Sequence, residues 1–272
     1  GIKTIELAAI SKSYDDRKLI EDYSYIFLKN DRIGIIGPNG CGKSTLLRII
    51  NGIVKPDAGS LDIGQTIRMG YFSQENEYMD DSMRVIDYVK EVGEYITTSD
   101  GKITASQMLE NFLFDGALQW SKIEKLSGGE KRRLYLLRIL MGAPNVLILD
   151  EPTNDLDIQT LTILEDYLDR FDGIIIVVSH DRYFLDRTVN RIFSFEGDGV
   201  IRQFEGGYSD YLIRKELEAL PEEMDASGAR KESRDDRTPN VEESPAENSK
   251  DTWKKRDKKL RFSFKEQREF EA

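Results

Sequence analysis

The stretch Gly37-Pro38-Asn39-Gly40-Cys41-Gly42-Lys43-Ser44 decides the fold, because it fits the phosphate-loop pattern G-x-x-x-x-G-K-[ST]. The apolar run at residues 33–36 predicts a strand before it, and residues 43–50 carry Leu and Ile at helical spacing. Glycines in such a loop let backbone N–H groups converge on phosphate oxygens, and the helix that follows adds partial positive charge. We therefore expect a phosphate-binding loop between a buried strand and a helix.

The residue types in this loop indicate their roles. Lys43 is predicted to bridge the β- and γ-phosphates of a nucleotide, and the Ser44 hydroxyl is predicted to bind Mg²⁺. A chance match has a probability of about 1% in a chain of this length, so a glycine-rich turn without a ligand is the weaker alternative. Cys41 is interpreted as a small space-filler and not as a nucleophile. Besides Lys43 and Ser44, the residues expected to line the nucleotide are Gly37, Pro38, Asn39, Gly40, Cys41, Gly42 and Thr45.

Two carboxylates, Asp150 and Glu151, end the apolar run at residues 146–149. Ligands of open α/β sheets bind at the carboxyl ends of the strands, which is where this pair would lie. In a phosphate-loop enzyme the first acid holds Mg²⁺ and the second orients or deprotonates the attacking water. The alternative is an Asp-Glu-Pro turn that only ends a strand. Beside the phosphate loop, we expect Asp150 to be a metal ligand and Glu151 to be the general base.

Short β-branched runs alternate with amphipathic stretches as far as residue 214, which is the pattern of an α/β fold. Apolar runs at residues 146–149 and 174–178 predict strands buried on both faces of a mostly parallel sheet. Leu and Ile at helical spacing predict helices at residues 129–141 and 158–170. Residues 2–10, 23–28 and 66–72 are expected to form an N-terminal antiparallel β subdomain, and residues 76–125 a mainly helical subdomain.

Composition excludes several classes of protein. The chain of 272 residues has 39 Lys and Arg against 50 Asp and Glu, a net charge of −11, so no general attraction to nucleic acid or anionic membrane is expected. A single Cys and a single His exclude a disulfide framework and Cys/His zinc sites. No apolar run approaches the ~20 residues of a membrane helix, and no secretory leader pattern opens the chain. We expect a cytoplasmic protein without membrane insertion.

Three segments are expected along the chain. Residues 1–214 form the nucleotide-binding domain, residues 215–252 a disordered acidic linker, and residues 253–272 the start of a C-terminal helical segment. From residue 221 to residue 251 there are ten acids, five bases and few large apolar side chains, too few to offset the entropy of ordering. The first residue is Gly1 and not Met, which suggests a tag remnant or a piece of a longer protein.

The run Leu126-Ser127-Gly128-Gly129-Glu130 lies 20 residues before the acidic pair. Together with the phosphate loop and Asp150-Glu151, it resembles the signature pattern of the ABC ATPases, the family of ATP-binding cassettes. The resemblance covers nearly all of residues 1–214 and implies ATP and Mg²⁺ as cofactors. Further residues match the family pattern in order: Tyr14, where the family stacks adenine on a ring, then Gln74, Asp157 and His180.

The resemblance also implies a mechanism. Two cassettes pack head to tail, and each ATP lies between the phosphate loop of one cassette and the signature of the other. Ser127, Gly128 and Gly129 would therefore contact the γ-phosphate of an ATP held by a partner, either a first cassette or a second copy. Gln74 would bind Mg²⁺ and sense the attacking water, and Asp157 would couple the two sites.

A lone His such as His180 is more often an ordinary satisfied residue than a catalytic one. His180 ends the apolar run at residues 174–178, which is expected to lie beside the strand that carries Glu151. The imidazole is therefore predicted to reach the γ-phosphate and to orient either Glu151 or the attacking water. Together with Lys43 and Gln74, these two residues form the predicted catalytic set.

Longer runs resemble one class within the family, the ABC-F proteins, which are soluble tandem-cassette ATPases without a membrane domain. The matching runs are residues 151–157 and residues 179–185. Residues 195–199 and 206–211 are similar to the end of the second cassette in Uup-type members, and residues 260–269 to the segment that leads into their coiled coil. The chain is therefore interpreted as the second half of a Uup-like protein.

This resemblance implies a factor that acts on ribosomes during translation, with branched DNA as a second substrate class. Residues 254–261, with six bases and one acid, are a candidate phosphate contact, whereas the alternative is a solvated helix face. A rival function is the nucleotide-binding subunit of an ABC membrane transporter, which would use the same ATP site. An inactive scaffold is disfavoured, because no motif residue is degenerate. The ABC-F runs favour the soluble class, with ribosome or nucleic-acid contacts made largely outside this cassette.

Overall fold

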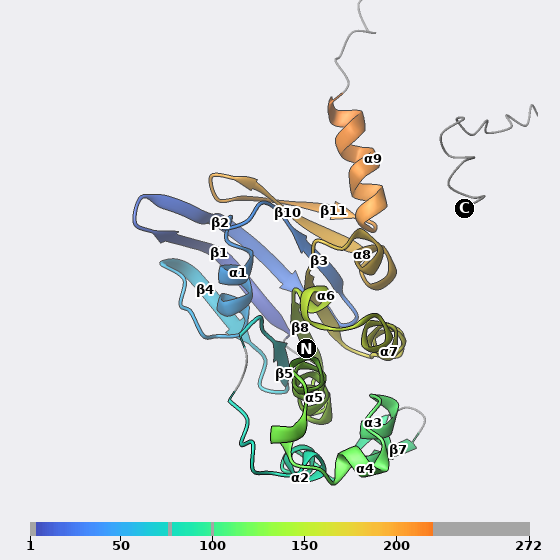
Figure 1. Ribbon diagram of the computed structural model, residues 1–272. Coiled ribbons are helices and arrows are strands. Elements are labelled where there is room, and N and C mark those ends of the chain that lie inside the picture. The colour runs from blue at the N-terminus through green and yellow to red at the C-terminus, as the bar shows by residue number, and fades with distance from the viewer. Residues whose placement is uncertain (1–3, 76–77, 99–100, 220–272) are drawn as a thin grey trace, which may run out of the picture. The chain divides into compact units, whose positions relative to one another are not determined.

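The computed structural model describes residues 4–75, 78–98 and 101–219, which form the α/β fold predicted from the sequence. At the centre is a six-stranded sheet with strand order β11-β10-β3-β9-β8-β5 (Figure 1). All neighbouring strands are parallel except β10 and β11. The strands are β3 (Arg32–Ile36), β5 (Met69–Phe72), β8 (Val146–Asp150), β9 (Ile174–Val178), β10 (Arg191–Gly197) and β11 (Val200–Glu205).

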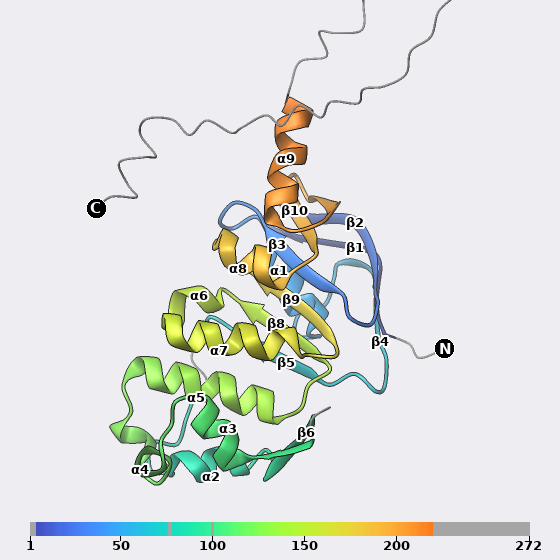
Figure 2. The ribbon, with the colours of Figure 1, turned by 90° about the vertical axis from the view of Figure 1, so that its right-hand side faces the viewer.

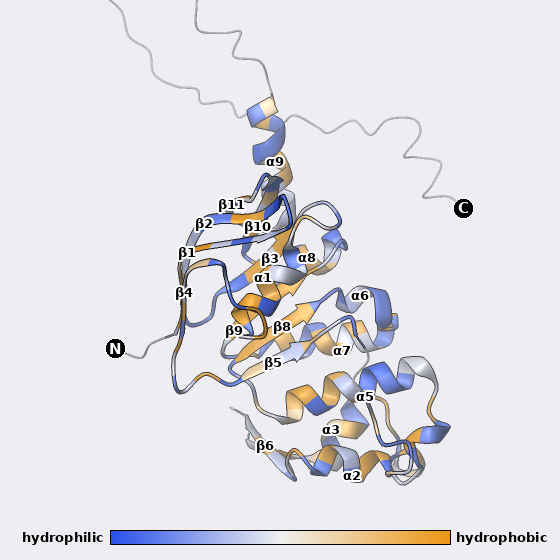
Figure 3. Ribbon diagram, turned by 90° about the vertical axis from the view of Figure 1, so that its left-hand side faces the viewer, coloured by the Kyte–Doolittle hydropathy of each residue, from blue (hydrophilic) through white to orange (hydrophobic). Residues whose placement is uncertain are grey.

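Strands β8 and β9 are buried along their whole length. Leu147 and Leu149 pack into one hydrophobic cluster, whereas Val146 and Ile148 pack into another on the opposite face of the sheet. Figure 3 shows the apolar colour running through both strands. Because each face of the sheet needs its own apolar layer, the sequence runs are continuously hydrophobic and not alternating. The predicted strands at residues 146–149 and 174–178 are confirmed.

Helices and a second sheet cover the two faces. On one face, α1 (Lys43–Ile50) lies between the central sheet and a three-stranded antiparallel sheet of order β2-β1-β4. The other face is covered by α5, α7 and α8, which supply Leu134, Leu164 and Leu185 to the cluster that contains Leu147 and Leu149. The predicted helices at residues 129–141 and 158–170 are confirmed to within one residue, whereas α8 was not predicted. The helices are α5 (Gly128–Met141), α7 (Ile158–Asp169) and α8 (Arg182–Thr188), and the antiparallel strands are β1 (Ile5–Tyr14), β2 (Arg17–Phe27) and β4 (Ala58–Ile63).

The expected N-terminal antiparallel subdomain is present, but one of its predicted strands lies elsewhere. Residues 66–72 contain β5, which pairs in parallel with β8 at the edge of the central sheet. The reason is close packing against α5: a methyl group added at Gly70 would lie 2.7 Å from Ile139. The third antiparallel strand is instead β4, whose mostly exposed sequence carries little hydrophobic signal.

In residues 78–98 and 101–125 most of the regular structure is helical, as predicted, although an unpredicted pair of strands is also present. Figure 2 shows these helices on the side of α5 away from α7. The two strands are β6 and β7, and Ile96, one of their β-branched residues, is buried in the core of this lobe. The elements are α2 (Val85–Lys90), β6 (Tyr95–Thr98), β7 (Gly101–Thr104), α3 (Ala105–Asn111), α4 (Gly116–Gln119) and a 3₁₀ turn (Ile123–Lys125).

The described part of the chain ends in α9 (Tyr208–Ala219), which extends past the predicted domain end at residue 214. From residue 220 onward, the predicted linker and the predicted C-terminal helical segment lie outside the described residues. Within the described ranges, no helix is both long enough and apolar enough to cross a bilayer.

Candidate functional site

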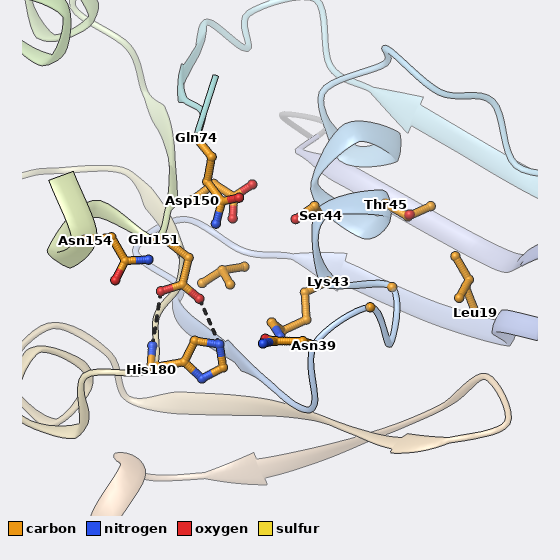
Figure 4. Close-up of a pocket in the computed structure, with 13 residues that line it drawn as sticks. Leu19, Asn39, Lys43, Ser44, Thr45, Gln74, Asp150, Glu151, Asn154 and His180 are labelled. Atoms are coloured by element: carbon orange, nitrogen blue, oxygen red, sulfur yellow. Dashed lines mark hydrogen bonds and ion pairs between the residues drawn. The ribbon is translucent and has the colours of Figure 1, made fainter. Parts of the chain in front are cut away.

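A cavity of about 470 Å³ opens at the N-terminus of α1, where the carboxyl ends of β8 and β9 meet the phosphate loop (Figure 4). It brings together residues that are far apart in the sequence. The predicted site residues that line it are Asn39, Gly40, Gly42, Lys43, Ser44, Thr45, Gln74, Asp150, Glu151 and His180. Phosphate-loop, acidic and histidine motifs thus share one cavity.

The phosphate loop folds tightly around Lys43. The Lys43 side chain is largely buried, and its Nζ donates to the carbonyls of Gly37 at 2.8 Å and Pro38 at 3.0 Å. Gly42 precedes α1 with φ of 117°, and a methyl group there would lie 3.2 Å from the carbonyl oxygen of Leu19. Only glycine takes this conformation without strain. Lys43 and the loop residues Asn39, Gly40 and Gly42 therefore line the cavity, where phosphate binding would use an ammonium and backbone N–H groups.

Asp150 ends β8 as a buried carboxylate with a free acceptor. Its Oδ1 has no hydrogen-bond partner, whereas Oδ2 accepts a long hydrogen bond of 3.4 Å from the Tyr71 hydroxyl. Burial raises the pKa of Asp150, and the charge of Glu151 adds to this effect, while the Ser44 hydroxyl opposes it. A buried oxygen without a partner is costly unless a cation contacts it.

This arrangement fits a divalent cation. Ser44 and Gln74 line the same cavity as Asp150, and hydroxyl, amide and carboxylate oxygens are the donors that Mg²⁺ prefers. In the described ranges no three His, Cys, Asp or Glu side chains gather into a protein-only metal centre. A Mg²⁺ shared with nucleotide phosphates needs only a few protein ligands, so the donor set is sufficient.

Glu151 has a strained backbone that directs its carboxylate into the cavity. Its φ of 52° and ψ of 52° are left-handed, which is unusual for a residue other than glycine. The amide N–H of Glu151 donates to the carbonyl of Val178 at 2.8 Å, and α6 (Pro152–Asp155) begins directly after it. The turn lets a residue at the end of a buried strand project its side chain toward the phosphate loop.

His180 contacts Glu151 through both its ring and its backbone (Figure 4). The imidazole Nε2 lies 3.2 Å from Glu151 Oε1, and the backbone N–H of His180 donates to Oε2 at 3.3 Å. The Glu151 side chain is 4% exposed, whereas that of His180 is 57% exposed and therefore open to a ligand. The pair has the geometry of a base held by an orienting partner.

Three other cavity-lining residues were missed by sequence reasoning: Leu19, Asn154 and Val178. Asn154 lies in the run 151–157, so the motif that carries the family resemblance could have identified it. Leu19 and Val178 are buried apolar residues, and nothing in their sequence context separates them from the ordinary core. Arg17, also missed, places its guanidinium beside Gly40 of the phosphate loop.

Some predicted site residues do not line the cavity. Tyr14 ends β1 with a half-exposed ring, and Lys12 Nζ lies 5.3 Å from the ring centroid. The partly buried Cys41 has its Sγ 2.9 Å from where a methyl group on Gly37 would lie, as expected of a residue that fills space inside the loop. The adenine contact of Tyr14 therefore stays a prediction.

Ser127 is the N-cap of α5 and forms a capping box with Glu130. The Ser127 backbone N–H and hydroxyl each donate to Glu130 Oε2 at 2.8 Å, and the backbone bond is the main cause of the lowered pKa of Glu130. Gly128 and Gly129 follow at the exposed first turn, where an added methyl group would meet no atom within 4 Å. None of these residues lines the cavity.

Asp157 caps α7 and also lies apart from the cavity. Its Oδ1 accepts from the Thr160 backbone N–H at 2.8 Å, which lowers the Asp157 pKa. Its Oδ2 lies 3.4 Å from Arg133 on α5. The role of Asp157 between two sites therefore stays a prediction.

Known proteins with similar sequences include ABC ATP-binding proteins. A family model described as "ABC transporter" matches residues 20–154. YfmR of Bacillus subtilis, an uncharacterized ABC transporter ATP-binding protein, is 55% identical over 78% of the chain and 34% of its own length. The energy-dependent translational throttle protein EttA of Haemophilus influenzae is 42% identical over 78% of the chain and 38% of its own length. A Uup-like ATP-binding protein of the same organism is 34% identical over 100% of the chain and 58% of its own length.

The chain thus spans about a third to three fifths of these curated relatives. Among solved structures, an ATP-binding cassette in a dimeric post-hydrolysis state bound to ADP and Pi matches with a TM-score of 0.59 and 21% identity. That match covers 74% of this chain and 98% of the cassette. At this identity the likeness concerns the fold. Motifs, relatives and fold together show that this chain belongs to the ABC ATPase family, as an ATP-binding cassette similar to those of the ABC-F proteins Uup and EttA.

Proposed function

We propose that this cassette hydrolyses ATP and that a second cassette completes its active site. The observation that carries the proposal is the contrast between the cavity and the α5 N-terminus. Lys43, Glu151 and His180 converge in one cavity, whereas the signature glycines Gly128 and Gly129 lie on an open surface outside it. A helix N-terminus with open space around its first turn suits an anion brought by another molecule.

Within the cavity, each residue of the chain has a distinct task. Lys43 and the N–H groups of the phosphate loop hold the phosphates of ATP. Glu151 accepts a proton from the attacking water, and His180 keeps the Glu151 carboxylate in place. When bound, Mg²⁺ would neutralise phosphate charge, held by Ser44, Asp150 and Gln74.

The partner cassette would supply the remaining positive potential. The first turn of its α5, with residues equivalent to Ser127 and Gly129, would approach the γ-phosphate and stabilise the charge that develops there. A charge-stabilising group supplied in trans is worth roughly 10³–10⁵ in rate in other phosphate-loop enzymes. ATP would therefore close the pair of cassettes and hydrolysis would reopen it, with Asp157 between the two sites.

We further propose that the protein acts in the cytoplasm on ribosomes during translation. The support is its relatedness to EttA, a protein named as a translational throttle, and to Uup-like ATP-binding proteins. With a net charge of −11, the cassette itself offers little general attraction for nucleic acid, so polyanion contacts would lie in other parts of the protein. Branched DNA is the second substrate class, and a transporter permease is the rival partner.

The test uses the full-length protein with Glu151→Gln, which should bind ATP without hydrolysing it. In sucrose-gradient sedimentation we expect the variant to travel with ribosomes when ATP is present and to remain at the top of the gradient without it. Preferential binding to a branched DNA duplex would favour the DNA substrate instead. Co-purification with a membrane permease would contradict the proposed role.

A further inference from the structure

Arg132, on α5, is buried against two segments that carry site residues. Its side chain is 9% exposed. Its Nη2 donates to the carbonyl of Ser73 and to Asp155 Oδ2, both at 2.8 Å, and Nη1 donates to the carbonyl of Glu75 at 3.3 Å. The guanidinium also lies over the ring of Phe72, 4.3 Å from its centroid. One side chain thus holds separate stretches of the chain together at a single point.

These contacts are made by segments that carry two of the site residues, Gln74 and Glu151. The two carbonyls belong to the neighbours of Gln74, so they hold the backbone from which Gln74 reaches the cavity. The carboxylate belongs to the last residue of α6, the short helix whose N-cap is Glu151. Arg132 lies about one turn beyond Gly129 on α5. The guanidinium therefore joins the Gln74 segment and the Glu151 turn to the start of α5.

We propose that Arg132 is a positioning residue that transmits ATP binding in this chain's own cavity to the open N-terminus of α5. The proposal rests on the proposed function, because the α5 N-terminus gains a phosphate to contact only when cassettes pair. ATP contacts Gln74 and Glu151, and the backbone segments that carry them are tied to Arg132. Any shift of these segments therefore moves the start of α5. The position of the cavity residues and the position of the α5 N-terminus therefore change together.

Arginine suits this role better than lysine does. The planar guanidinium offers several donors in a fixed fork, so it binds two carbonyls and a carboxylate at once while its face rests on Phe72. An ammonium group is a point charge without that fork and cannot reproduce the set of contacts. Arg132→Lys therefore keeps the charge and removes the geometry.

Arg138 provides a matched control on the same helix. Its guanidinium lies 4.1 Å from the centroid of the Tyr88 ring, donates to the Tyr88 carbonyl and pairs with Glu91 Oε2 at 3.1 Å. The ring, carbonyl and carboxylate contacts of Arg132 are thus repeated, but neither Tyr88 nor Glu91 is next in sequence to a residue that lines the site cavity. A loss that is specific to Arg132 cannot then be attributed to a weaker attachment of α5 in general.

The test is hydrogen–deuterium exchange on the whole chain, with and without Mg-ATP, at a concentration at which light scattering reports a monomer. In the wild type, ATP should slow exchange at the amides of residues 127–131 by about threefold, the size of a typical coupling through one contact. Arg132→Lys and Asp155→Asn should abolish this slowing while the ATP dissociation constant changes by less than about twofold. Arg138→Lys and Glu91→Gln should keep both properties.

An unchanged ATP response in Arg132→Lys or Asp155→Asn would overturn the proposal, as would no response in the wild type or an equal loss in Arg138→Lys. If Arg132→Lys fails to fold by circular dichroism, Asp155→Asn decides, because its side chain is 35% exposed and folding should tolerate the change. Hydrolysis is measured separately. A wild type that shows the exchange response but no turnover would refute the proposed activity and leave the role of Arg132 standing.

Discussion

The N-termini of α1 and α5 both begin with glycine-containing turns, but their surroundings differ. At α1, Gly42 has φ of 117°, and a methyl group would lie 3.0 Å from Leu19 Cβ. At α5, neither Gly128 nor Gly129 has a positive φ, and a methyl group on either would meet no atom within 4 Å. The chain's own packing therefore explains the glycine at α1 and does not explain those at α5.

Glycine without a packing reason is a cost to the chain. Each Gly in a helix is less favourable than Ala by about 0.5–1 kcal/mol. Such a cost is consistent with a backbone that another molecule must approach closely. In the proposed mechanism, the α1 end belongs to the part of the active site that lies inside this chain, and the α5 end completes the active site of a partner.

The largest effect is expected from a substitution in the cavity. Glu151→Gln removes the proposed proton acceptor and keeps the size of the side chain. We expect the hydrolysis rate to fall by about 10²–10⁴, as is usual for loss of a general base, with ATP affinity nearly unchanged. Phosphate release and equilibrium ATP binding measure the two quantities. Turnover close to that of the wild type would remove Glu151 from its assigned role.

The next largest effect is expected from a substitution at the α5 N-terminus. Gly129→Asp places a negative charge where a partner's γ-phosphate would approach, so hydrolysis should fall by about 10²-fold, comparable to loss of an oxyanion-hole donor. The melting temperature should stay level or rise, because an acidic residue near a helix N-terminus is favourable and the position is open. Calorimetry and phosphate release check the two expectations.

Gly116→Asp is the matched control for that variant. Gly116 also opens a helix, α4, and a methyl group there would likewise meet no atom within 4 Å. The hydrolysis rate of Gly116→Asp should therefore stay within about twofold of the wild-type rate, as for most surface changes away from a site. Equal losses in both glycine variants would mean that the α5 end has no special role.

The smallest effect tests the cavity without any nucleotide. Asp150→Asn removes a buried carboxylate whose Oδ1 has no partner. The free energy of unfolding of the ligand-free chain should therefore rise by about 1 kcal/mol, which is roughly 2–4 °C in melting temperature. Because burial raises the folded-state pKa of Asp150, the charged form destabilises the fold above that pKa. The gain should therefore be full at pH 8 and shrink as the pH falls toward the ordinary Asp pKa of about 3.9. A loss of stability in Asp150→Asn at pH 8 would contradict the description of this carboxylate.

Sequence reasoning identified the cavity well where motifs impose their own geometry. The phosphate loop needs a strand before it and a helix after it, so β3 and α1 follow directly from the residues of that loop. The pairing of Glu151 with His180 was also predictable, because both end apolar runs that form neighbouring strands. In these places local chemistry and tertiary position are determined by the same few residues.

Other features depend on contacts that no local pattern reveals. Strand β5 joins the parallel sheet because Gly70 lets α5 approach closely, and its alternating burial looks the same as that of an antiparallel strand. The left-handed backbone of Glu151 is imposed by its surroundings, because Glu has no preference for positive φ. In the sequence, Arg132 is one of several charges on a predicted amphipathic helix, and only the fold brings it to the neighbours of Gln74.

The most direct test of the shared site mixes two variants that are each inactive. In a mixed pair of Glu151→Gln and Gly129→Asp chains, one of the two sites combines the intact cavity of one chain with the intact α5 N-terminus of the other. If pairing is random, half of the pairs are mixed and each has one working site, so about a quarter of the wild-type rate should return. A mixture that stays as inactive as its components, or a wild-type specific rate that does not depend on protein concentration, would contradict a site completed by a second cassette.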